Sequence, residues 1–599
     1  MPTYKAPLRD LKFAYFELFD GEGLTKLPGF EEATPDLLLS VVEEMGKIAS
    51  EVLQPLNAVG DQQGCQLENG QVRTPKGFAE AWKLLRDGGW MGLTARTEYG
   101  GQGLPHTAGN MTAEILQAGN LSFSMYYALT HGAYSALDKH ATEALKARFI
   151  PKLVDGTWAG TMCLTEPQCG TDLGLVRMKA ETFAGSEADA YKLTGNKIFI
   201  SAGDHQISEN IIHLVLARLP DAPAGIKGIS LFVIPKLREE NGHWVANGVV
   251  CTGLEHKMGI KGSATCSLSF DSSIGYLVGQ PNQGMKAMFT FMNGARLHVG
   301  ISALALAEVG RQGAVAFARE RLQGRALSGA KQPDQPADSI LVHPDVRRML
   351  LTIRAFTEGA RALTAWTSIE IDHHESSPDP ERALAGDDFA SLMTPIVKAF
   401  LTDLGFEATN TALQVYGGYG YCSDYGVEQL VRDCRITQIY EGTNGIQALD
   451  LVGRKMPAHM GRYLRRFCHP VQEFLDAEAA TAEMTEFVEP TAKAFERLQR
   501  ASAWLAQEAM KNPNEAGAAA TDYLHLFGWV TFAYLWARSA KVAQTRLAAG
   551  AIGEEKAFYE AKIATARFFM NRMLPRHSAH FSQILAGSKS MMEFPDAAF

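Results

Sequence analysis

The sequence predicts a multidomain protein of the α+β class, in which helical segments flank one β-rich segment. The chain has 599 residues, whereas a single hydrophobic core stops growing at about 250–300 residues. Apolar residues recur with helical spacing toward both ends, but between about 160 and 275 they come in short β-branched runs. We therefore expect helices, a β-domain, helices and extra helices, in that order.

The β-rich segment departs most clearly from helical spacing. Its runs of β-branched and aromatic residues are 197–201, 211–216 and 229–234. Closely spaced strands without intervening helices favour an antiparallel sandwich or barrel over βαβ units. The predicted domains are 1–158, 159–280, 281–457 and 458–599.

Helix signals mark both flanks of this segment. Residues 34–53 open with threonine and proline, a capping residue and a first-turn residue, and then show apolar residues every three or four positions. The Ala-rich C-terminal segment is helical, with a break at 511–514. Two polar stretches, 331–338 and 373–388, are predicted to be loops.

Composition and charge exclude several classes of protein. The chain carries 57 Lys and Arg against 66 Asp and Glu, a net charge of −9, which is not the basic footprint of a nucleic-acid-binding protein. We expect no membrane-spanning segment and no secretory signal. Eight cysteines without a Cys-x-x-Cys pair favour free thiols in a reducing compartment. A soluble, cytoplasmic protein is expected.

Several common signatures are absent from the sequence or unconvincing. There is no Gly-x-Ser-x-Gly elbow, Walker A loop or His-Glu-x-x-His helix. The glycines at 417–420 lack Rossmann spacing. Residues 372–375, Asp-His-His-Glu, have the residue types of metal ligands, but they lie in a polar stretch, and adjacent histidines on a loop rarely converge on one ion. We predict a solvated loop there and no metal site.

Three segments carry residue types that suit one chemistry. Residues 164–172 combine proline and glycine bends with two hydroxyls, which offer donors to an anionic ligand. Residues 197–203 end a strand with a serine and small residues that let a flat group approach. Residues 438–445 place one carboxylate, Glu441, between an apolar run and a glycine turn. Taken singly, a glutamate on a loop is usually a surface residue.

In this order and spacing the three segments resemble the acyl-CoA dehydrogenase family. The motifs are Leu-Thr-Glu-Pro-x-x-Gly-Thr-Asp, Ile-Phe-Ile-Ser-x-Gly and Tyr-Glu-Gly-Thr, and 291–296, 320–324 and 414–418 also look like family segments. The resemblance runs from about 80 to 455, and the remainder resembles the long bacterial subgroup with a C-terminal extension. It implies an N-terminal helical domain, a central β-barrel or sandwich, a C-terminal four-helix bundle and an additional helical domain.

The resemblance implies FAD as the cofactor. Implied flavin contacts are Leu164, Thr165, Phe199 and Ser201, the last toward N5, the atom that accepts hydride. Gly170 and Thr171 are implied at the pyrophosphate and on the CoA side. The other implied cofactor residues are Arg321 and Gln323, which reach the FAD of a partner subunit, Gln414, Gly417 and Gly418 at the adenine end, and Thr443. A site built from two chains implies a homo-oligomer, with a C2 homodimer expected.

Glu441 is the candidate catalytic base. Desaturating a Cα–Cβ bond needs a base for the α-proton and an acceptor for the β-hydride, which protein side chains do not provide and a flavin does. A carboxylate serves when burial and the bound thioester raise its pKa toward the working pH. Some relatives carry the base one residue before Arg296, where this chain has Ala295. Implied acyl-CoA contacts are Thr171, Asn293, Arg296 and Gly442, with a structural ion pair as the alternative role of Arg296.

The sequence also departs from the family pattern. Gly445 stands where many relatives have a glutamine, and Gly324 where a phenylalanine is usual. Gly294 leaves room for a bulkier or longer acyl chain. The extension after 455 is expected to cover the face that a second dimer occupies in tetrameric relatives.

The leading function is therefore an FAD-dependent acyl-CoA dehydrogenase of β-oxidation that passes electrons to electron-transferring flavoprotein. A straight medium-to-long acyl chain is expected. Alternatives are an acyl-CoA oxidase that uses O2 and a thioether, methylmercaptopropionyl-CoA, dehydrogenase. A nucleic-acid-binding relative of the same fold is disfavoured by the acidic charge, and a catalytically dead binding protein by Glu441.

Overall fold

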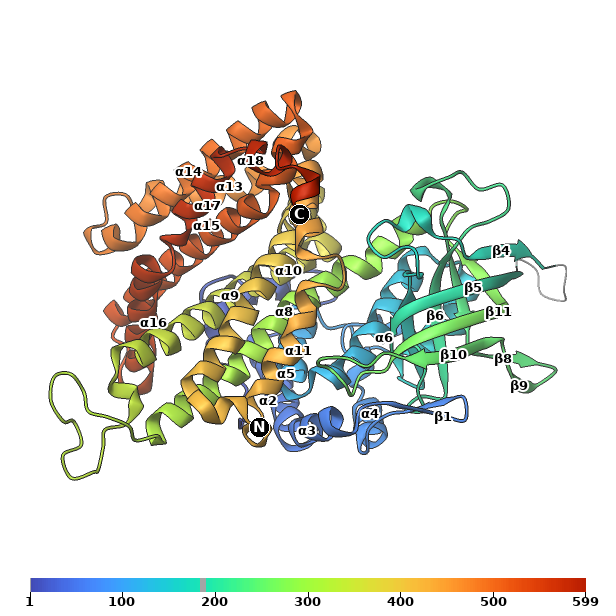
Figure 1. Cartoon of the computed structure of the whole chain (residues 1–599), viewed down its shortest axis with the longest axis horizontal. Helices are drawn as coiled ribbons and strands as arrows, with labels where there is room; N and C mark the ends of the chain where they lie inside the picture. Colours follow the sequence, from blue (N-terminus) through green and yellow to red (C-terminus); the bar gives the residue numbers. More distant parts are fainter. Residues whose placement is uncertain (1, 184–189) are drawn as a thin grey trace. The chain divides into compact units, whose positions relative to one another are not determined.

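A computed structural model describes residues 2–183 and 190–599 of the chain. The chain forms two compact units (Figure 1). We call Glu44–His298 the sheet unit, and Met1–Glu43 together with Val299–Phe599 the helical unit.

The centre of the sheet unit is one seven-stranded sheet. Its strands are β3 (Trp158–Cys163), β4 (Lys179–Thr182), β5 (Ala190–Ser201), β6 (Asn210–Ala217), β7 (Ser230–Pro235), β10 (Val249–Leu254) and β11 (Thr265–Val278). They run in the order β3-β6-β7-β11-β5-β4, with β10 also paired to β11. All the pairs are antiparallel except β3 with β6. The predicted β-domain is confirmed, with one parallel pair that the sequence did not indicate.

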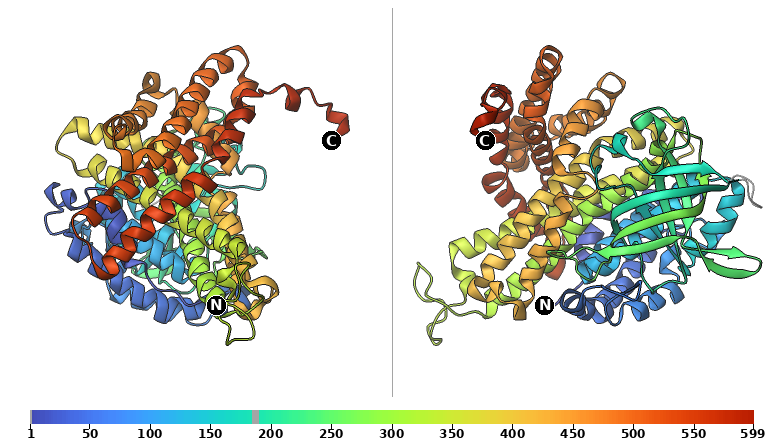
Figure 2. Two further views of the ribbon diagram at one scale, coloured as in Figure 1. Left: turned by 90° about the vertical axis from the view of Figure 1, so that its left-hand side faces the viewer. Right: turned by 45° about the vertical axis from the view of Figure 1, so that its right-hand side comes forward.

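Each predicted run lies in a strand, except that Ile229 immediately precedes β7. Residues 197–201 end β5, and every residue of β6 and β7 is buried, because these strands have both faces covered. Two small hairpins also belong to this unit: β1 (Gln66–Glu68) with β2 (Gln71–Arg73), and β8 (Leu237–Glu240) with β9 (His243–Ala246). The second hairpin projects from the sheet in the right-hand view of Figure 2.

Within the sheet unit, the helical segment that precedes the sheet in the sequence packs against it. Its helices are α3 (Gln54–Gln63), α4 (Phe78–Asp87), α5 (His106–Gly119), α6 (Leu121–His140) and α7 (Glu143–Val154). Asn120 caps α6, because its side chain accepts from the Phe123 N–H at 3.0 Å. Helix α6 packs against β3. The predicted helix at 34–53 is α2 (Pro35–Ile48), continued by a π-helical turn at Ala49–Leu53.

Long helices make up the helical unit. They are α8 (Gly284–Glu320, which starts in the sheet unit), α9 (Pro344–Ser376), α10 (Pro380–Tyr416), α11 (Val427–Arg435) and α12 (Asn444–Asp450). Helices α9 and α10 pack side by side. By length and composition alone, Pro380–Tyr421 could cross a membrane, but 72% of its apolar window is buried in the chain, as is usual for the core helix of a bundle.

The C-terminal extension is helical, as predicted. Its helices are α13 (Ala458–Glu478), α14 (Thr485–Lys511), α15 (Pro513–Ala548), α16 (Gly553–Arg572), α17 (Arg576–Leu585) and α18 (Lys589–Met592). The predicted break is the α14–α15 turn, where the Asn512 side chain accepts from the Asn514 N–H at 3.0 Å. In the left-hand view of Figure 2 the last residues, with α18, project from the other helices of this unit.

The loop predicted at 373–388 is wrong in most of its length. Residues 372–375 form the last turn of α9, and α10 begins at Pro380, with Asp379 as its capping residue. Asp372 is buried. Polar composition is misleading here because these residues occupy helix ends, where Asp and Pro are favoured. Among the residues that the structure describes, no three His, Cys, Asp or Glu side chains come together as a metal site.

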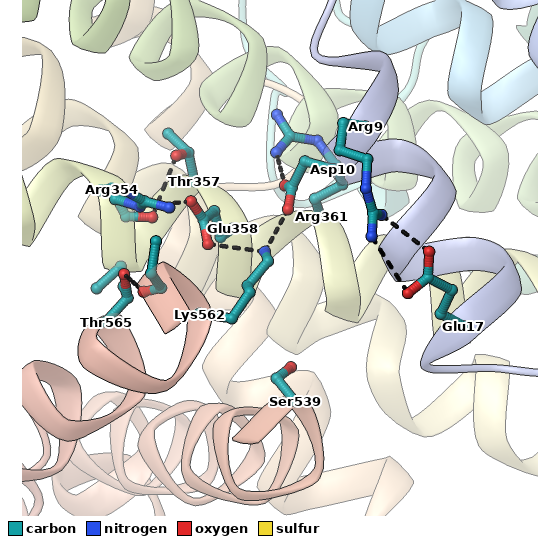
Figure 3. Close-up of polar contacts among 12 residues, drawn as sticks. Arg9, Asp10, Glu17, Arg354, Thr357, Glu358, Arg361, Ser539, Lys562 and Thr565 are labelled. Atoms are coloured by element: carbon teal, nitrogen blue, oxygen red, sulfur yellow. Dashed lines mark hydrogen bonds and ion pairs between the residues drawn. The ribbon is translucent and has the colours of Figure 1, made fainter. Parts of the chain in front are cut away.

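A buried charge network joins the N-terminal segment to the extension within the helical unit (Figure 3). Asp10 of α1 (Leu8–Lys12) contacts both Arg361 of α9 and Lys562 of α16. The Lys562 ammonium also donates to Glu358 at 2.7 Å, and Arg354 donates to the same carboxylate at 2.7 Å. The N-terminus, the bundle and the extension therefore share one set of buried ion pairs.

Candidate active site

In the sheet unit, the loop at 164–172 is fastened to the end of β5. The Ile198 N–H donates to the Thr165 carbonyl at 2.9 Å. The Lys197 ammonium, fully buried, donates to the Leu164 carbonyl at 3.0 Å and to a Glu166 carboxylate oxygen at 2.9 Å. Two of the three predicted segments, which carry Leu164, Thr165, Phe199 and Ser201, therefore meet in one place.

Glu166 organises this loop from inside. Its carboxylate accepts from the backbone N–H of Arg177 at 2.7 Å and of Met178 at 3.1 Å, and from the Gln168 amide at 2.6 Å. Burial raises the pKa of Glu166, but Lys197 and the backbone donors outweigh it and leave the pKa lowered. Glu166 is thus a charged structural clamp. Glu166 and Lys197 lie in two different predicted segments, and no local pattern indicated that they pair.

Phe199 sits on a bulge of β5. Cys266 pairs with Ile200 and Leu268 with Lys197, so β5 has one more residue than β11 over this stretch. Phe199 takes φ +58°, in the left-handed region that favours glycine, and its side chain is 58% exposed. The fold thus accepts backbone strain to present an aromatic ring at the strand end.

The other predicted residues of the sheet unit lie in open positions. Gly170 and Thr171 are exposed, and a Cβ on Gly170 would meet only the Thr165 methyl, at 3.9 Å. On α8, Asn293 is exposed, whereas Arg296 is buried with its guanidinium 5.7 Å from the Phe289 ring centre. Ala295, between them, carries no titratable group.

In the helical unit, Glu441 lies on a strained turn. The turn joins a 3-10 segment, Ile436–Gln438, to α12. Glu441 takes φ +58° and Gly442 φ +90°, and a left-handed conformation costs a non-glycine residue about 1–2 kcal/mol. The buried Gln447 amide donates to the Glu441 carbonyl at 3.2 Å. Strain held by surrounding contacts is a recurring property of functional residues.

The predicted adenine-end residues lie where α10 ends. Gln414, Gly417 and Gly418 are exposed, and a Cβ on either of these glycines would meet nothing within 4 Å. Thr443, predicted separately as a cofactor residue, is exposed just before α12. Gly417 takes φ +59°, a conformation that costs glycine little free energy but is sterically unfavourable for residues with a Cβ atom. The Arg321 guanidinium lies 5.3 Å from the Tyr419 ring centre.

Gln323 begins a long loop closed by a bridge between Leu322 and Ser339. Gly324 takes φ +70°, a conformation that glycine adopts with little steric cost. The loop is organised by Asp338, which is completely buried. Its carboxylate accepts from the backbone N–H of Ala326, Lys331 and Gln332 at 2.9, 2.9 and 2.7 Å.

These backbone donors, Ala326 foremost, lower the pKa of Asp338 to about 2. Asp338 therefore remains a carboxylate and fixes the loop at any working pH. No motif in the sequence marks Asp338 as a functional or structural residue. An acidic residue at the end of a Pro- and Gly-rich loop was the available signal.

We predict that Asp338→Ala unfolds this loop locally while the helices remain folded. In this variant three backbone N–H groups lose their acceptor. The Arg325 guanidinium also donates to the carbonyls of Gln332 and Gln335, and these hydrogen bonds weaken when the loop backbone is no longer held in place. Trypsin is expected to cut after Arg325 and Lys331 several times faster than in the unaltered protein, as measured by mass spectrometry of the fragments. Exposed Asp334 of the same loop offers the control, Asp334→Ala. Equal cutting in both variants would contradict the prediction.

The predicted site residues therefore divide between the two units. Leu164, Thr165, Gly170, Thr171, Phe199, Ser201, Asn293 and Arg296 belong to the sheet unit, and Arg321, Gln323, Gln414, Gly417, Gly418, Glu441, Gly442 and Thr443 to the helical unit. Their roles stay predictions.

Comparison with known proteins identifies the family. Three domain models match successive parts of the chain: acyl-CoA dehydrogenase N-terminal domain at 40–157, middle domain at 161–273 and C-terminal domain at 282–456. A fourth, acetyl-CoA dehydrogenase C-terminal like, matches 467–595. The chain belongs to the acyl-CoA dehydrogenase family, whose members are FAD-dependent oxidoreductases that act on the CH–CH bond of acyl-CoA.

Several relatives match along the whole chain. It is 40% identical to the 3-methylmercaptopropionyl-CoA dehydrogenase of Ruegeria pomeroyi, over 98% of this chain and 99% of that one. It is 32% identical to the broad-specificity linear acyl-CoA dehydrogenase of Mycobacterium tuberculosis, over 100% of both. The crystal structure of an acyl-CoA dehydrogenase from Bacillus anthracis, complexed with FAD, shares the fold with a TM-score of 0.75 at 19% identity, over 97% of this chain and 92% of that one.

The residues present fit FAD. In the sheet unit, an exposed phenyl ring held on a bulge offers a stacking surface for a flat ring system, and Gly170 leaves room beside Thr165. In the helical unit, Gly417 and Gly418 leave backbone open to approach. FAD is the cofactor, and the open space at these glycines is compatible with the predicted contacts to it.

Phe199→Gly separates cofactor binding from folding. Glycine accepts φ +58° without steric cost, which offsets roughly the 0.5–1 kcal/mol that it loses in a strand. The thermal midpoint of the apoprotein is expected to stay within a few degrees, while the Kd for FAD rises by up to about tenfold through loss of a stacked ring. Flavin fluorescence titration measures the Kd. Ile226→Ala, at another exposed apolar side chain of this unit, is the control, and an unchanged Kd in Phe199→Gly would refute the stacking role.

Proposed function

We propose that the protein desaturates a fatty acyl-CoA between Cα and Cβ in β-oxidation, with Glu441 as the base, and passes the electrons to electron-transferring flavoprotein. One observation carries the assignment of the base: Glu441 is held in a left-handed turn at φ +58°, in a motif of this family. Ala295, at the alternative position, cannot accept a proton.

Glu441 removes the α-proton of the thioester, and its backbone N–H donates to the thioester carbonyl, where negative charge develops. FAD supplies the hydride acceptor when bound. On the sheet unit, Ser201 and Thr165 orient the cofactor by hydrogen bonds, and Phe199 packs on it. Lys197 and Glu166 keep these groups in place by fastening the loop at 164–172 to β5.

We further propose a straight acyl chain of medium to long length. The match to a broad-specificity linear acyl-CoA dehydrogenase supports a linear chain. The match to a 3-methylmercaptopropionyl-CoA dehydrogenase supports a second candidate, a thioether chain. Sulfur replaces one methylene in that chain, so pentanoyl-CoA has nearly the same length and shape. A difference in activity between these two thioesters therefore reports the effect of the sulfur atom and not of chain length.

The deciding experiment is anaerobic titration of the FAD-loaded protein with octanoyl-, pentanoyl- and 3-methylmercaptopropionyl-CoA. Bleaching of the flavin bands by octanoyl-CoA supports the proposal. Bleaching by the thioether alone moves the assignment to the second candidate. A flavin that none of the three reduces would contradict both. Hydrogen peroxide formed in stoichiometric amount during aerobic turnover would indicate an oxidase instead of a dehydrogenase.

We expect the side chain at position 294 to influence which acyl chain lengths the protein accepts. Gly294 is exposed on α8, and a Cβ there would meet nothing within 4 Å. Gly294→Leu should lower kcat/KM for octanoyl-CoA by about tenfold relative to butyryl-CoA, because a clash of one or two methylenes is worth about 1–3 kcal/mol. Gly517→Leu, at another open helical glycine, is the control. The same chain-length profile in both variants would remove the idea.

A cytoplasmic homodimer completes the proposal. Its support is the acidic charge, the free cysteines of the sequence and the segment at Arg321 and Gln323, which the family resemblance assigns to a partner subunit. Light scattering of the purified protein measures the assembly, and a tetramer would contradict it.

A further inference from the structure

The turn that carries Glu441 is held from both sides by one carboxylate. Gln438, three residues before Glu441, donates its amide to Asp403 Oδ1 at 2.6 Å. Asn444, three residues after it, donates to the same oxygen at 2.7 Å. Asp403 lies on α10, and its carboxylate therefore ties both flanks of the turn to that helix.

Asn444 is itself firmly placed. Its amide also donates to the Thr402 hydroxyl at 2.9 Å, and its carbonyl oxygen accepts from the buried Lys398 ammonium at 2.7 Å. These partners are all on α10. Among these α10 groups, Asp403 is the one that also binds Gln438, on the other side of Glu441.

The second oxygen of Asp403 is bound by the C-terminal extension. His525 of α15 places Nε2 3.0 Å from Asp403 Oδ2, and both side chains are largely buried, at 14% and 25% exposure. Burial raises the pKa of Asp403, but His525, Gln438 and Asn444 outweigh it and leave the pKa lowered. Asp403 is thus a carboxylate with partners on both oxygens.

The position of His525 is in turn fixed within the extension. Its ring stacks on that of His580 of α17, with centres 5.1 Å apart and planes at 16°. His580 Nδ1 lies 2.9 Å from a carboxylate oxygen of Asp522, on α15. One turn further along α15, Gly528 allows close packing on α10, because a Cβ there would lie 2.4 Å from the Phe400 ring.

We propose that His525 is a positioning residue for the catalytic base: through Asp403 it holds the Glu441 turn in its strained conformation, so that the C-terminal extension takes part in catalysis. The proposal rests on the function proposed above. Displacement of a catalytic group by about 1 Å costs up to about a hundredfold in rate. The extension therefore has a role beyond covering a surface of the bundle.

The test uses three full-length variants with FAD bound, with rates expressed per bound flavin so that loss of folded protein does not count as loss of activity. His525→Ala is expected to lower kcat about tenfold or more, with KM within about twofold. His525→Gln places an amide Nε2 near the position of the imidazole Nε2 and should recover most of kcat. The control is Tyr523→Phe, on the same helix as His525. It removes the buried 2.7 Å contact with Ser502 of α14 and should leave kcat unchanged.

A second readout isolates the proton step. In D2O, the base exchanges the α-proton of a 3-thia-acyl-CoA, which has no hydrogen on its β-atom to transfer, and mass spectrometry follows the exchange. Exchange should slow in His525→Ala in proportion to kcat and recover in His525→Gln. Unchanged kcat and exchange in His525→Ala, or an equal loss in Tyr523→Phe, would overturn the proposal. If the unaltered protein itself exchanges no proton and no acyl-CoA reduces its flavin, the proposed function fails instead.

Discussion

Replacing Glu441 with Gln is expected to lower kcat by about a hundredfold to ten-thousandfold, the usual contribution of a general base, while FAD and acyl-CoA still bind. Gln has the size of Glu and bears the same backbone cost at φ +58°. It keeps the Gln447 bond to its carbonyl. What it lacks is a group that accepts the α-proton at neutral pH.

The measurement is the rate of flavin reduction in an anaerobic stopped-flow experiment, together with Kd values for FAD and for a saturated acyl-CoA. Glu407→Gln serves as the control, since Glu407 is an exposed glutamate of α10 that pairs with Arg576 at 2.6 Å. We expect the Glu441 variant alone to be slow, with both Kd values changed by less than about threefold. A normal reduction rate in Glu441→Gln would show that another group is the base.

Local patterns predicted the elements well because each element obeys a short-range rule. Short runs of β-branched residues indicate β5, β6 and β7, and a capping residue followed by proline indicates the start of α2. The same reasoning failed at 372–375, where a polar composition hid the last turn of α9. Polar composition is typical of exposed residues, and the ends of helices are often exposed. Composition alone therefore does not distinguish a helix end from a loop.

The candidate site was predictable as a set of residues but not as an arrangement. Nothing in the sequence indicates that Phe199 and Glu441 take left-handed conformations, since propensity would place glycine or asparagine there. The link from His525 to Asp403 spans 122 positions, and that from Lys562 to Asp10 spans 552. Such pairs follow no periodicity, because only tertiary packing brings them together.

Replacing Lys562 with Met is expected to lower the free energy of unfolding by about 3–5 kcal/mol, the usual cost of breaking a buried ion pair from one side. Lys562 is 2% exposed and lies between the carboxylates of Asp10 and Glu358, each 9% exposed. Without the Lys562 ammonium, each of these buried carboxylates loses one cationic partner. Asp10 keeps Arg361, and Glu358 keeps Arg354. The matched control is Arg567→Met on the same helix, because Arg567 and Glu486 form an exposed pair that is worth about 0–1 kcal/mol.

The stability that the Asp10 ion pairs contribute depends on pH, and the lowered pKa of Asp10 gives the direction of this dependence. Burial raises the pKa of Asp10, but Lys562 and Arg361 outweigh it, so the pKa of the folded protein lies below the ordinary value, which is about 4. The Asp10 ion pairs therefore stabilise the protein above pH of about 4 and lose this effect as pH falls through the lowered pKa. Urea unfolding should show a deficit of Lys562→Met that is full at pH 7 and shrinks as pH falls below about 4.

A double-variant cycle then separates the pair from its surroundings. Asp10→Asn combined with Lys562→Met removes both charges, and removal of both partners is nearly neutral where removal of one is not. We expect the double variant to recover at least half of the stability lost in Lys562→Met. Additive losses would mean that Asp10 and Lys562 act independently. In that case the N-terminal segment and α16 would be held by their apolar contacts, such as Phe13 against Phe558, and not by the buried charges.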